Sequence, residues 1–233
     1  GLMFGPETST ANRAMIGGMI GNNSCGLHSI VWGDTRQNLL ELKGLLSNGQ
    51  EVEFKEIPLA QIAEKAQLNS LEGIIYKGVS ELVNKPQNIE AIEKGYPKKT
   101  LTRRNTGYAL DFLIPQEGKE NFNMCELIAG SEGTLLFVTE AKLKLLPLPP
   151  KQEALVCVHF NSLAESLLAN IIILKHQPMA SELVDKYIMD FTKGHPVYQH
   201  NRFFIEGEPE ALLMVEFFAE TQQEIDFKTS ALI

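Results

Sequence analysis

The clearest periodic pattern in the chain is a pair of apolar runs on either side of Asn48-Gly49. Residues 39–46 are rich in leucine, and Val52, Phe54 and Ile57 alternate with polar residues after the dipeptide. Alternation with a period of two is typical of half-buried strands, and Asn-Gly favours tight hairpin turns. The pattern therefore predicts a type I′ hairpin with two strands, at residues 38–46 and 50–57.

The spacing of apolar residues becomes helical after Pro58. Apolar residues recur at intervals of about three to four positions, and they are Leu71, Ile74, Ile75, Val79 and Leu82. This spacing predicts a helix within residues 58–82. Asn69 followed by Glu72 resembles a capping box, and a second, shorter helix is expected near residues 88–95.

A proline-rich segment divides the chain. Before it, the pattern predicts a short helix near residues 123–128, a turn bounded by Gly130 and Gly133, and a strand from Leu135 onward. Pro147-Leu148-Pro149-Pro150 follows, and such segments are stiff and extended. We therefore expect two domains, at residues 1–147 and 151–233.

The second of these regions alternates between strand and helix patterns. Strands are expected at 153–160 and 211–218, and Ser162 with Glu165 forms a capping-box pair that opens a helix toward Lys175. A strand end with a helix near 181–191 and a helix from Gln222 complete the pattern. This order predicts the start of a ferredoxin-like module. The fold class is therefore α+β, with a mixed or antiparallel sheet flanked by helices in the first domain.

Four glycines lie within ten residues, from Gly17 to Gly26, with Asn22, Asn23 and Ser24 between them. Glycine allows a backbone to approach a ligand closely, and successive N–H groups can bind an anion. The residues favour a loop around a phosphate-bearing or planar polar ligand. A tight glycine-rich turn on a β scaffold explains them equally well, and the residues alone leave both explanations open.

Composition narrows the class of protein. The chain has 233 residues and a formal net charge of −8, which argues against general nucleic-acid binding. Its three cysteines, Cys25, Cys125 and Cys157, are far apart, so they indicate no disulfide framework, zinc site or internal iron–sulfur cluster. A reducing, cytoplasmic setting is expected. We find no signal peptide or membrane-spanning run, and we expect a piece of a longer protein.

A local basic cluster occurs in this acidic chain at residues 98–111, where Arg103 and Arg104 are adjacent. Arginine suits bidentate contact with a carboxylate or phosphate, so the cluster is a candidate pocket for an acidic substrate or a cofactor phosphate. A solvated loop or helix face is the alternative, because charge runs usually lie on the surface.

Two segments together resemble the FAD-linked oxidase family, the vanillyl-alcohol-oxidase (PCMH-type) flavoprotein superfamily. They are residues 16–26, and Gly130-Ser131-Glu132-Gly133-Thr134-Leu135 with Val138-Thr139-Glu140. Within this family, the chain most resembles the D-2-hydroxyacid dehydrogenases: the glycolate oxidase subunit, D-lactate and D-2-hydroxyglutarate dehydrogenase group. The segments at 8–13 and 103–108 resemble the large bacterial members of this group, which carry a C-terminal iron–sulfur region, so the resemblance allows an iron–sulfur cluster in the full-length parent but not in this chain.

The resemblance implies a cofactor, FAD, and a set of residues that hold it. The residues implied at the flavin ring and pyrophosphate are Gly17, Gly18, Asn22, Asn23, Ser24 and Gly26. Those implied at the adenosine half are Gly130, Ser131, Glu132 and Gly133, with the backbone of Val138 at the adenine edge. The substrate candidates are Arg103, Arg104 and His28. No catalytic base or metal ligand is assigned, because the five histidines do not form the family's late motifs.

The chain departs from the family pattern in three respects. Leu136 stands where glycine is common, and Cys25 stands where a small residue is usual. A covalent flavin link through Cys25 is an alternative to a buried structural thiol, which we favour. The family's first phosphate loop has no match here. The resemblance therefore implies that residues 1–147 are a partial FAD-binding domain without its N-terminal subdomain, and that residues 151–233 are part of a substrate cap domain.

The resemblance implies an enzyme that oxidises a small D-2-hydroxyacid (lactate, glycolate or 2-hydroxyglutarate) by hydride transfer to FAD. Its electron acceptor is unidentified, and a homodimer is considered. Two other hypotheses remain: a non-catalytic fragment that binds FAD weakly or not at all, and an FAD-linked enzyme of the enolpyruvyl reductase type.

Overall fold

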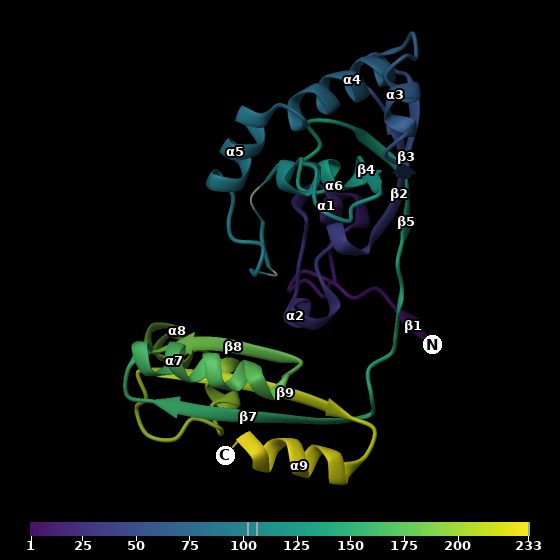
Figure 1. The fold of residues 1–233 in the computed structure, drawn as a ribbon. Helices are drawn as coiled ribbons and strands as arrows, with labels where there is room; N and C mark the ends of the chain where they lie inside the picture. The colour runs from purple at the N-terminus through teal and green to yellow at the C-terminus, as the bar shows by residue number, and fades with distance from the viewer. Residues whose placement is uncertain (102, 106, 233) are drawn as a thin grey trace. The chain divides into compact units, whose positions relative to one another are not determined.

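The structure is a computed structural model that describes residues 1–101, 103–105 and 107–232. It divides into two compact units, Gly1–Leu146 and Pro147–Ile233, beside the proline-rich segment (Figure 1). Both units combine helices with antiparallel sheets, so the predicted α+β class is confirmed. The predicted functions of the two domains remain proposals.

The first unit is built on a four-stranded antiparallel sheet in the order β4-β3-β2-β5. Its strands are β2 (Leu39–Leu45), β3 (Glu51–Pro58), β4 (Asn121–Asn123) and β5 (Phe137–Leu143). Its helices are α1 (Ile16–Asn22), α2 (Ser29–Trp32), α3 (Gln61–Lys65), α4 (Leu71–Val83), α5 (Pro86–Gly95) and α6 (Cys125–Ile128). Two short strands, β1 (Leu2–Met3) and β6 (Leu146–Pro147), pair with each other.

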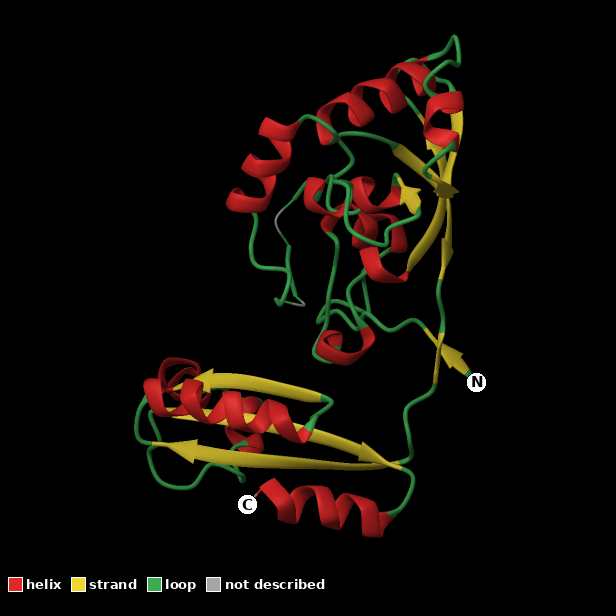
Figure 2. Cartoon of the chain, in the orientation of Figure 1, coloured by secondary structure: helices red, strands yellow, loops and turns green. Residues whose placement is uncertain are grey.

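One face of this sheet is buried and the other is exposed. Leu42 and Phe54 point into the core, which also contains Tyr76 of α4 and Leu127 of α6. The exposed face carries cross-strand ion pairs, such as Lys43 with Glu140 at 2.7 Å. Figure 2 shows most helices gathered on one side of the sheet. The alternation of apolar and polar residues in the sequence therefore reflects a two-layer arrangement, with the sheet in one layer and helices in the other.

The hairpin is present, but its predicted turn type is wrong. Glu41 pairs with Lys55 and Leu45 with Glu51, as the predicted strands require. A type I′ turn needs positive φ at both central residues, whereas Gly49 has a φ of +82° and Asn48 is not among the positive-φ residues. The hairpin thus closes with a longer loop in which a left-handed glycine follows the turn.

The single helix predicted within residues 58–82 is two helices, α3 and α4, separated at residues 66–70. The N-cap of α4 is Ser70 and not the predicted Asn69, because the Ser70 Oγ accepts a hydrogen bond from the Gly73 N–H at 3.3 Å. A Cβ at Gly73 would lie 2.1 Å from the Leu68 carbonyl oxygen, so the break needs a glycine there.

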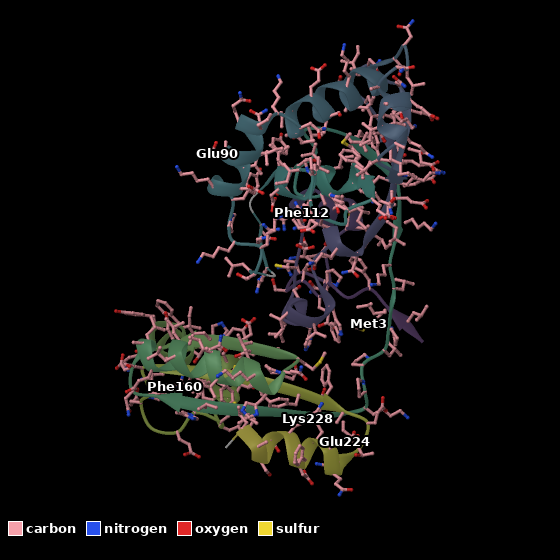
Figure 3. All side chains as sticks on the ribbon, viewed as in Figure 1. Met3, Glu90, Phe112, Phe160, Glu224 and Lys228 are labelled. Carbon is pink, nitrogen blue, oxygen red and sulfur yellow. The ribbon has the colours of Figure 1, made fainter. Side chains whose placement is uncertain are left out.

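The second unit contains the predicted order of strands and helices. It consists of β7 (Gln152–Phe160), α7 (Leu163–Ile173), β8 (Ala180–Asp185), α8 (Lys186–Lys193), β9 (Ala211–Ala219) and α9 (Gln222–Leu232). β9 lies between β7 and β8 and is antiparallel to both. This split β-α-β arrangement is that of a ferredoxin-like module. Figure 3 labels Phe160 on β7, whose side chain packs with those of α7 and α9.

Candidate functional site

The glycine-rich stretch forms a helix, so the predicted loop is wrong over most of its length. Residues Ile16–Asn22 are α1, and Asn23, with a φ of 49°, ends the helix in the left-handed conformation. Gly17 and Gly18 precede Gly21 by four and three positions, so the three glycines share one face of the helix. Met19 and Ile20 are buried on the other side.

The two glycine-containing segments of the sequence contact each other directly. The Gly130 N–H donates to the Ile20 carbonyl and the Glu132 N–H donates to the Gly21 carbonyl, both at 2.9 Å. Gly130 and Glu132 have positive φ values of 88° and 52°, which turn the chain toward α1. Residues more than a hundred positions apart thus form one continuous backbone surface.

Two of the glycines are required by the packing of the protein itself. A Cβ at Gly26 would lie 2.1 Å from the Glu7 carbonyl oxygen, so no side chain fits there. A Cβ at Gly130 would lie 2.8 Å from the Arg36 guanidinium, and its φ of 88° is unfavourable for other residues. These two positions are explained without any ligand.

Gly17 and Gly18 have no such explanation. No atom of the described residues lies within 4 Å of a Cβ built at either position, and both glycines are exposed. Glycine in a helix is less stable than alanine by roughly 1 kcal/mol. The face that they share with Gly21 is therefore flat and open beside the 130–133 loop, where Gly133 is exposed too. This surface can accept a planar ligand closer to the backbone than a side chain would allow.

Asn23 supports the fold rather than facing solvent. Its side chain is buried, donates to Asp34 Oδ2 at 2.9 Å, and accepts the Arg36 N–H at 2.8 Å. A weaker contact of 3.4 Å reaches Asn105. These hydrogen bonds hold the end of α1 against the segment at residues 34–36. The predicted contact of Asn23 with the cofactor remains a prediction.

Arg36, which the sequence did not indicate as a site residue, connects the segment at residue 107 with the segment at residues 126–129. It is only 4% exposed, and its guanidinium donates to the carbonyls of Glu126 at 2.8 Å, Ala129 at 2.5 Å and Gly107 at 3.3 Å. It also lies 5.4 Å from the centre of the Phe112 ring, labelled in Figure 3. Burial lowers the pKa of Arg36, while the charge of Asp34 opposes that shift. No motif or spacing distinguishes such an arginine from a surface one.

The remaining implied cofactor residues differ in accessibility. Asn22 and Glu132 are exposed, whereas Ser24 and Ser131 are buried. Val138 is half-buried and packs against the core, on the edge strand β5. Leu136, the departure from the family pattern, is buried where Gly44 leaves room for it.

The two arginines of the basic cluster have different environments. Arg104 forms an ion pair with Asp111 in which both side chains are largely buried, and it lies over Phe112. Arg103 is exposed, and its Nε lies 3.0 Å from Cys25 Sγ. The structure therefore leaves Arg103, not Arg104, accessible to a ligand. Residues 102 and 106 of this cluster lie outside the described residues.

His28 and Cys25 flank Gly26. His28 is buried, with its Nδ1 2.6 Å from Glu7 Oε2 and its ring 4.4 Å from that of Trp32. Cys25 is half-buried, which differs from the buried structural thiol that the sequence favoured. In the described part of the chain, no cluster of histidine, cysteine or carboxylate side chains has the arrangement of a metal site.

Residues 1–55, which include α1 and the hairpin up to the last three residues of β3, match the model of the FAD binding domain family. The second glycine segment, which that match does not include, is hydrogen-bonded to α1 in the structure. The first 55 residues of the chain are therefore similar to the FAD binding domain family, and FAD is the cofactor class that this similarity supports.

The chain is similar to three kinds of 2-hydroxyacid enzyme. It is 32% identical to D-2-hydroxyglutarate dehydrogenase of Pseudomonas putida over 100% of the chain and 23% of the relative. It is 23% identical to D-lactate dehydrogenase of Archaeoglobus fulgidus over 96% of the chain and 37% of that protein. Glycolate oxidase subunit GlcD of Bacillus subtilis is 26% identical over 80% of the chain and 28% of that subunit.

A solved structure of alkyldihydroxyacetonephosphate synthase has the same fold over 100% of this chain and 33% of its own, with a TM-score of 0.56 and 15% identity. The chain thus spans about a quarter of the D-2-hydroxyglutarate dehydrogenases that it matches, and a third of this structure. None of the helices in the described residues has the length and apolar character needed to cross a bilayer.

Proposed function

We propose that this chain is one segment of a longer flavoprotein that oxidises a small D-2-hydroxyacid. Gly1–Leu146 would supply the second part of the FAD-binding domain, and the unit from Pro147 onward would begin the substrate cap. The names of the relatives support this substrate class, since they are D-2-hydroxyglutarate, D-lactate and glycolate enzymes. The particular acid and the electron acceptor are not assigned.

One observation supports the cofactor site more than any other. Gly17 and Gly18 lower the stability of α1 without meeting any atom of the protein, and they adjoin the loop that is hydrogen-bonded to the same helix. This open surface fits a planar group with a pyrophosphate, which needs close backbone approach and exposed N–H donors. We propose that α1 holds the flavin and pyrophosphate, and that residues 130–133 hold the adenosine half.

Bound FAD would supply the acceptor for the hydride that leaves the substrate α-carbon. The residues of this chain would hold and orient the reactants. We propose that the exposed Arg103 guanidinium binds the substrate carboxylate as a charge-assisted pair. Arg104, which is paired with Asp111, would keep the loop in place, and His28 would brace the segment around Gly26 through Glu7.

The decisive experiment is anaerobic reduction of the full-length protein. Addition of D-2-hydroxyglutarate, D-lactate or glycolate should bleach the flavin absorbance, whereas NADPH and the L-acids should not. Bleaching by NADPH alone would instead support the enolpyruvyl reductase alternative. A full-length protein that binds no flavin would contradict the proposal and support the non-catalytic alternative.

The same assay tests the role of Arg103. Arg103→Ala should raise the KM for the hydroxyacid about tenfold or more, because a charge-assisted hydrogen bond of about 1.5–3 kcal/mol is lost. Arg13→Ala is the matched control, since Arg13 is exposed and its guanidinium donates to the neighbouring Asn12 side chain. An unchanged KM would show that Arg103 does not bind the substrate.

Gly17→Ala and Gly18→Ala should have opposite effects on stability and on cofactor binding. Each alanine should stabilise α1 by up to about 1 kcal/mol, because nothing surrounds the added methyl group. Each should also weaken FAD binding about tenfold, because the methyl group holds the flavin away from the backbone. Flavin titration of the apoprotein and thermal unfolding measure the two effects. Unchanged FAD affinity in both variants would mean that the open face does not contact the cofactor.

A further inference from the structure

Tyr108 has an unusual environment for an exposed aromatic residue. Its side chain is 45% exposed, yet its hydroxyl lies 2.6 Å from Thr134 Oγ1. The backbone around it is held as well, because its carbonyl accepts a hydrogen bond from the Tyr96 hydroxyl and the Gly107 carbonyl accepts one from Arg36. An exposed tyrosine ordinarily gives its hydroxyl to water, so here the ring is fixed in position.

The direction of these hydrogen bonds can be assigned. Thr134 has one hydroxyl proton, and it donates that proton to the Ser131 carbonyl at 2.6 Å. The Tyr108 hydroxyl must therefore donate to Thr134 Oγ1. The polar end of Tyr108 is used entirely by the 131–134 turn, and the rest of the side chain presents an aromatic surface.

The second glycine segment is open next to the residue that anchors Tyr108. Gly133 immediately precedes Thr134 and has a φ of +74°, and no atom of the described residues lies within 4 Å of a Cβ built there. On the other side of the same loop, Arg103 and Asn105 contact Cys25 at 3.0 and 3.4 Å. Arg103 and Asn105 thus contact the chain just after α1, and Tyr108 contacts the turn at residues 131–134.

We propose that the ring of Tyr108 packs against the adenine of FAD and is a further cofactor-binding residue. Planar bases pack readily on aromatic side chains, and each such contact is worth about 1–3 kcal/mol. The proposal rests on the proposed function, in which residues 130–133 hold the adenosine half. The proposal adds the side chain of Tyr108 to this adenosine site. Tyr108 lies between the two glycine segments in the sequence.

The test uses apoprotein prepared from the full-length flavoprotein and titrated with FAD. Tyr108→Ala should weaken FAD binding about tenfold, because the aromatic surface is lost. Once saturated, the variant should keep the visible absorption and circular dichroism of the bound flavin, since the adenine lies far from the flavin ring. Tyr108→Leu should behave like Tyr108→Ala, because leucine has bulk but no aromatic face.

Two matched variants distinguish the effect of the aromatic ring from the effect of its hydrogen bond to Thr134. Tyr108→Phe and Thr134→Val each remove the same hydrogen bond and leave the ring, so each should weaken FAD binding no more than about threefold. If Tyr108→Ala does not fold, the comparison of Tyr108→Phe with Tyr108→Leu decides the question.

Two results would overturn the proposal. One is unchanged FAD affinity in Tyr108→Ala and Tyr108→Leu. The other is a changed flavin spectrum in those variants, which would place the ring at the flavin or give it only a structural role. Absence of FAD from the wild-type protein would overturn the proposed function itself, and this inference with it.

Discussion

Replacing Arg36 with leucine should lower the free energy of unfolding of the first unit by about 3 kcal/mol or more. The guanidinium is the donor to three carbonyl groups from two separate segments, and each buried carbonyl left without a donor costs about 1–3 kcal/mol. Urea unfolding of the 233-residue chain measures the effect. Its single tryptophan, Trp32, lies in the first unit, so the fluorescence reports that unit.

Arg36→Lys and Arg13→Leu are the controls for this prediction. Lysine keeps the charge but cannot reach three carbonyls at once, so Arg36→Lys should also be strongly destabilising. Arg13 is exposed, and its loss should change stability by no more than about 0.5 kcal/mol. If Arg36→Leu unfolds at the same urea concentration as the wild-type chain, the three hydrogen bonds do not stabilise the unit.

Gly26→Ala should be as damaging, for a different physical reason. The added methyl carbon would lie 2.1 Å from the carbonyl oxygen of Glu7 and 2.7 Å from its nitrogen, and neither is a flexible atom. Separating the two backbones should cost about 3 kcal/mol and displace the segment that holds His28 against Glu7. The same urea measurement applies.

Gly17→Ala is the matched control for Gly26→Ala, because both glycines belong to one ten-residue stretch. The first variant should be as stable as the wild-type chain or more so, and the second far less stable. Equal unfolding midpoints for the two variants would show that the packing around Gly26 is not what requires a glycine.

The local patterns of the sequence predicted local structure well. The hairpin, the short helix before Gly130 and the strand–helix order of the second unit depend on spacing along the chain, and all are present. The prediction was wrong at the glycine-rich stretch, which was expected to be a loop and is the helix α1. Glycines are poor helix formers, yet α1 forms because Met19 and Ile20 are buried and its carbonyls bond to residues 130 and 132. That contribution comes from segments that a local pattern does not include.

The residues of the candidate site could likewise be predicted only as far as local sequence patterns allow. Both glycine segments could be selected from the sequence, because glycine enrichment and the family resemblance are visible there. The sequence could not show which of these glycines are open to a ligand and which pack against the protein. Gly26 is buried against the Glu7 backbone, whereas Gly17 lies in α1 and is exposed, and neither environment is visible in the sequence. The two adjacent arginines likewise differ only in the neighbours that the fold gives them: Asp111 for Arg104, and Cys25 for Arg103.

The sequence by itself determined the α+β class, the resemblance to FAD-binding proteins and the two glycine-containing segments proposed to hold the cofactor. Those properties depend on residue type and spacing, which the chain displays directly. The tertiary structure decided that the glycine stretch is a helix, that Arg36 joins the parts of the site, and that Tyr108 is anchored on the 131–134 turn. These depend on contacts between residues far apart in the chain, and burial and hydrogen bonding fix them only after the chain has folded.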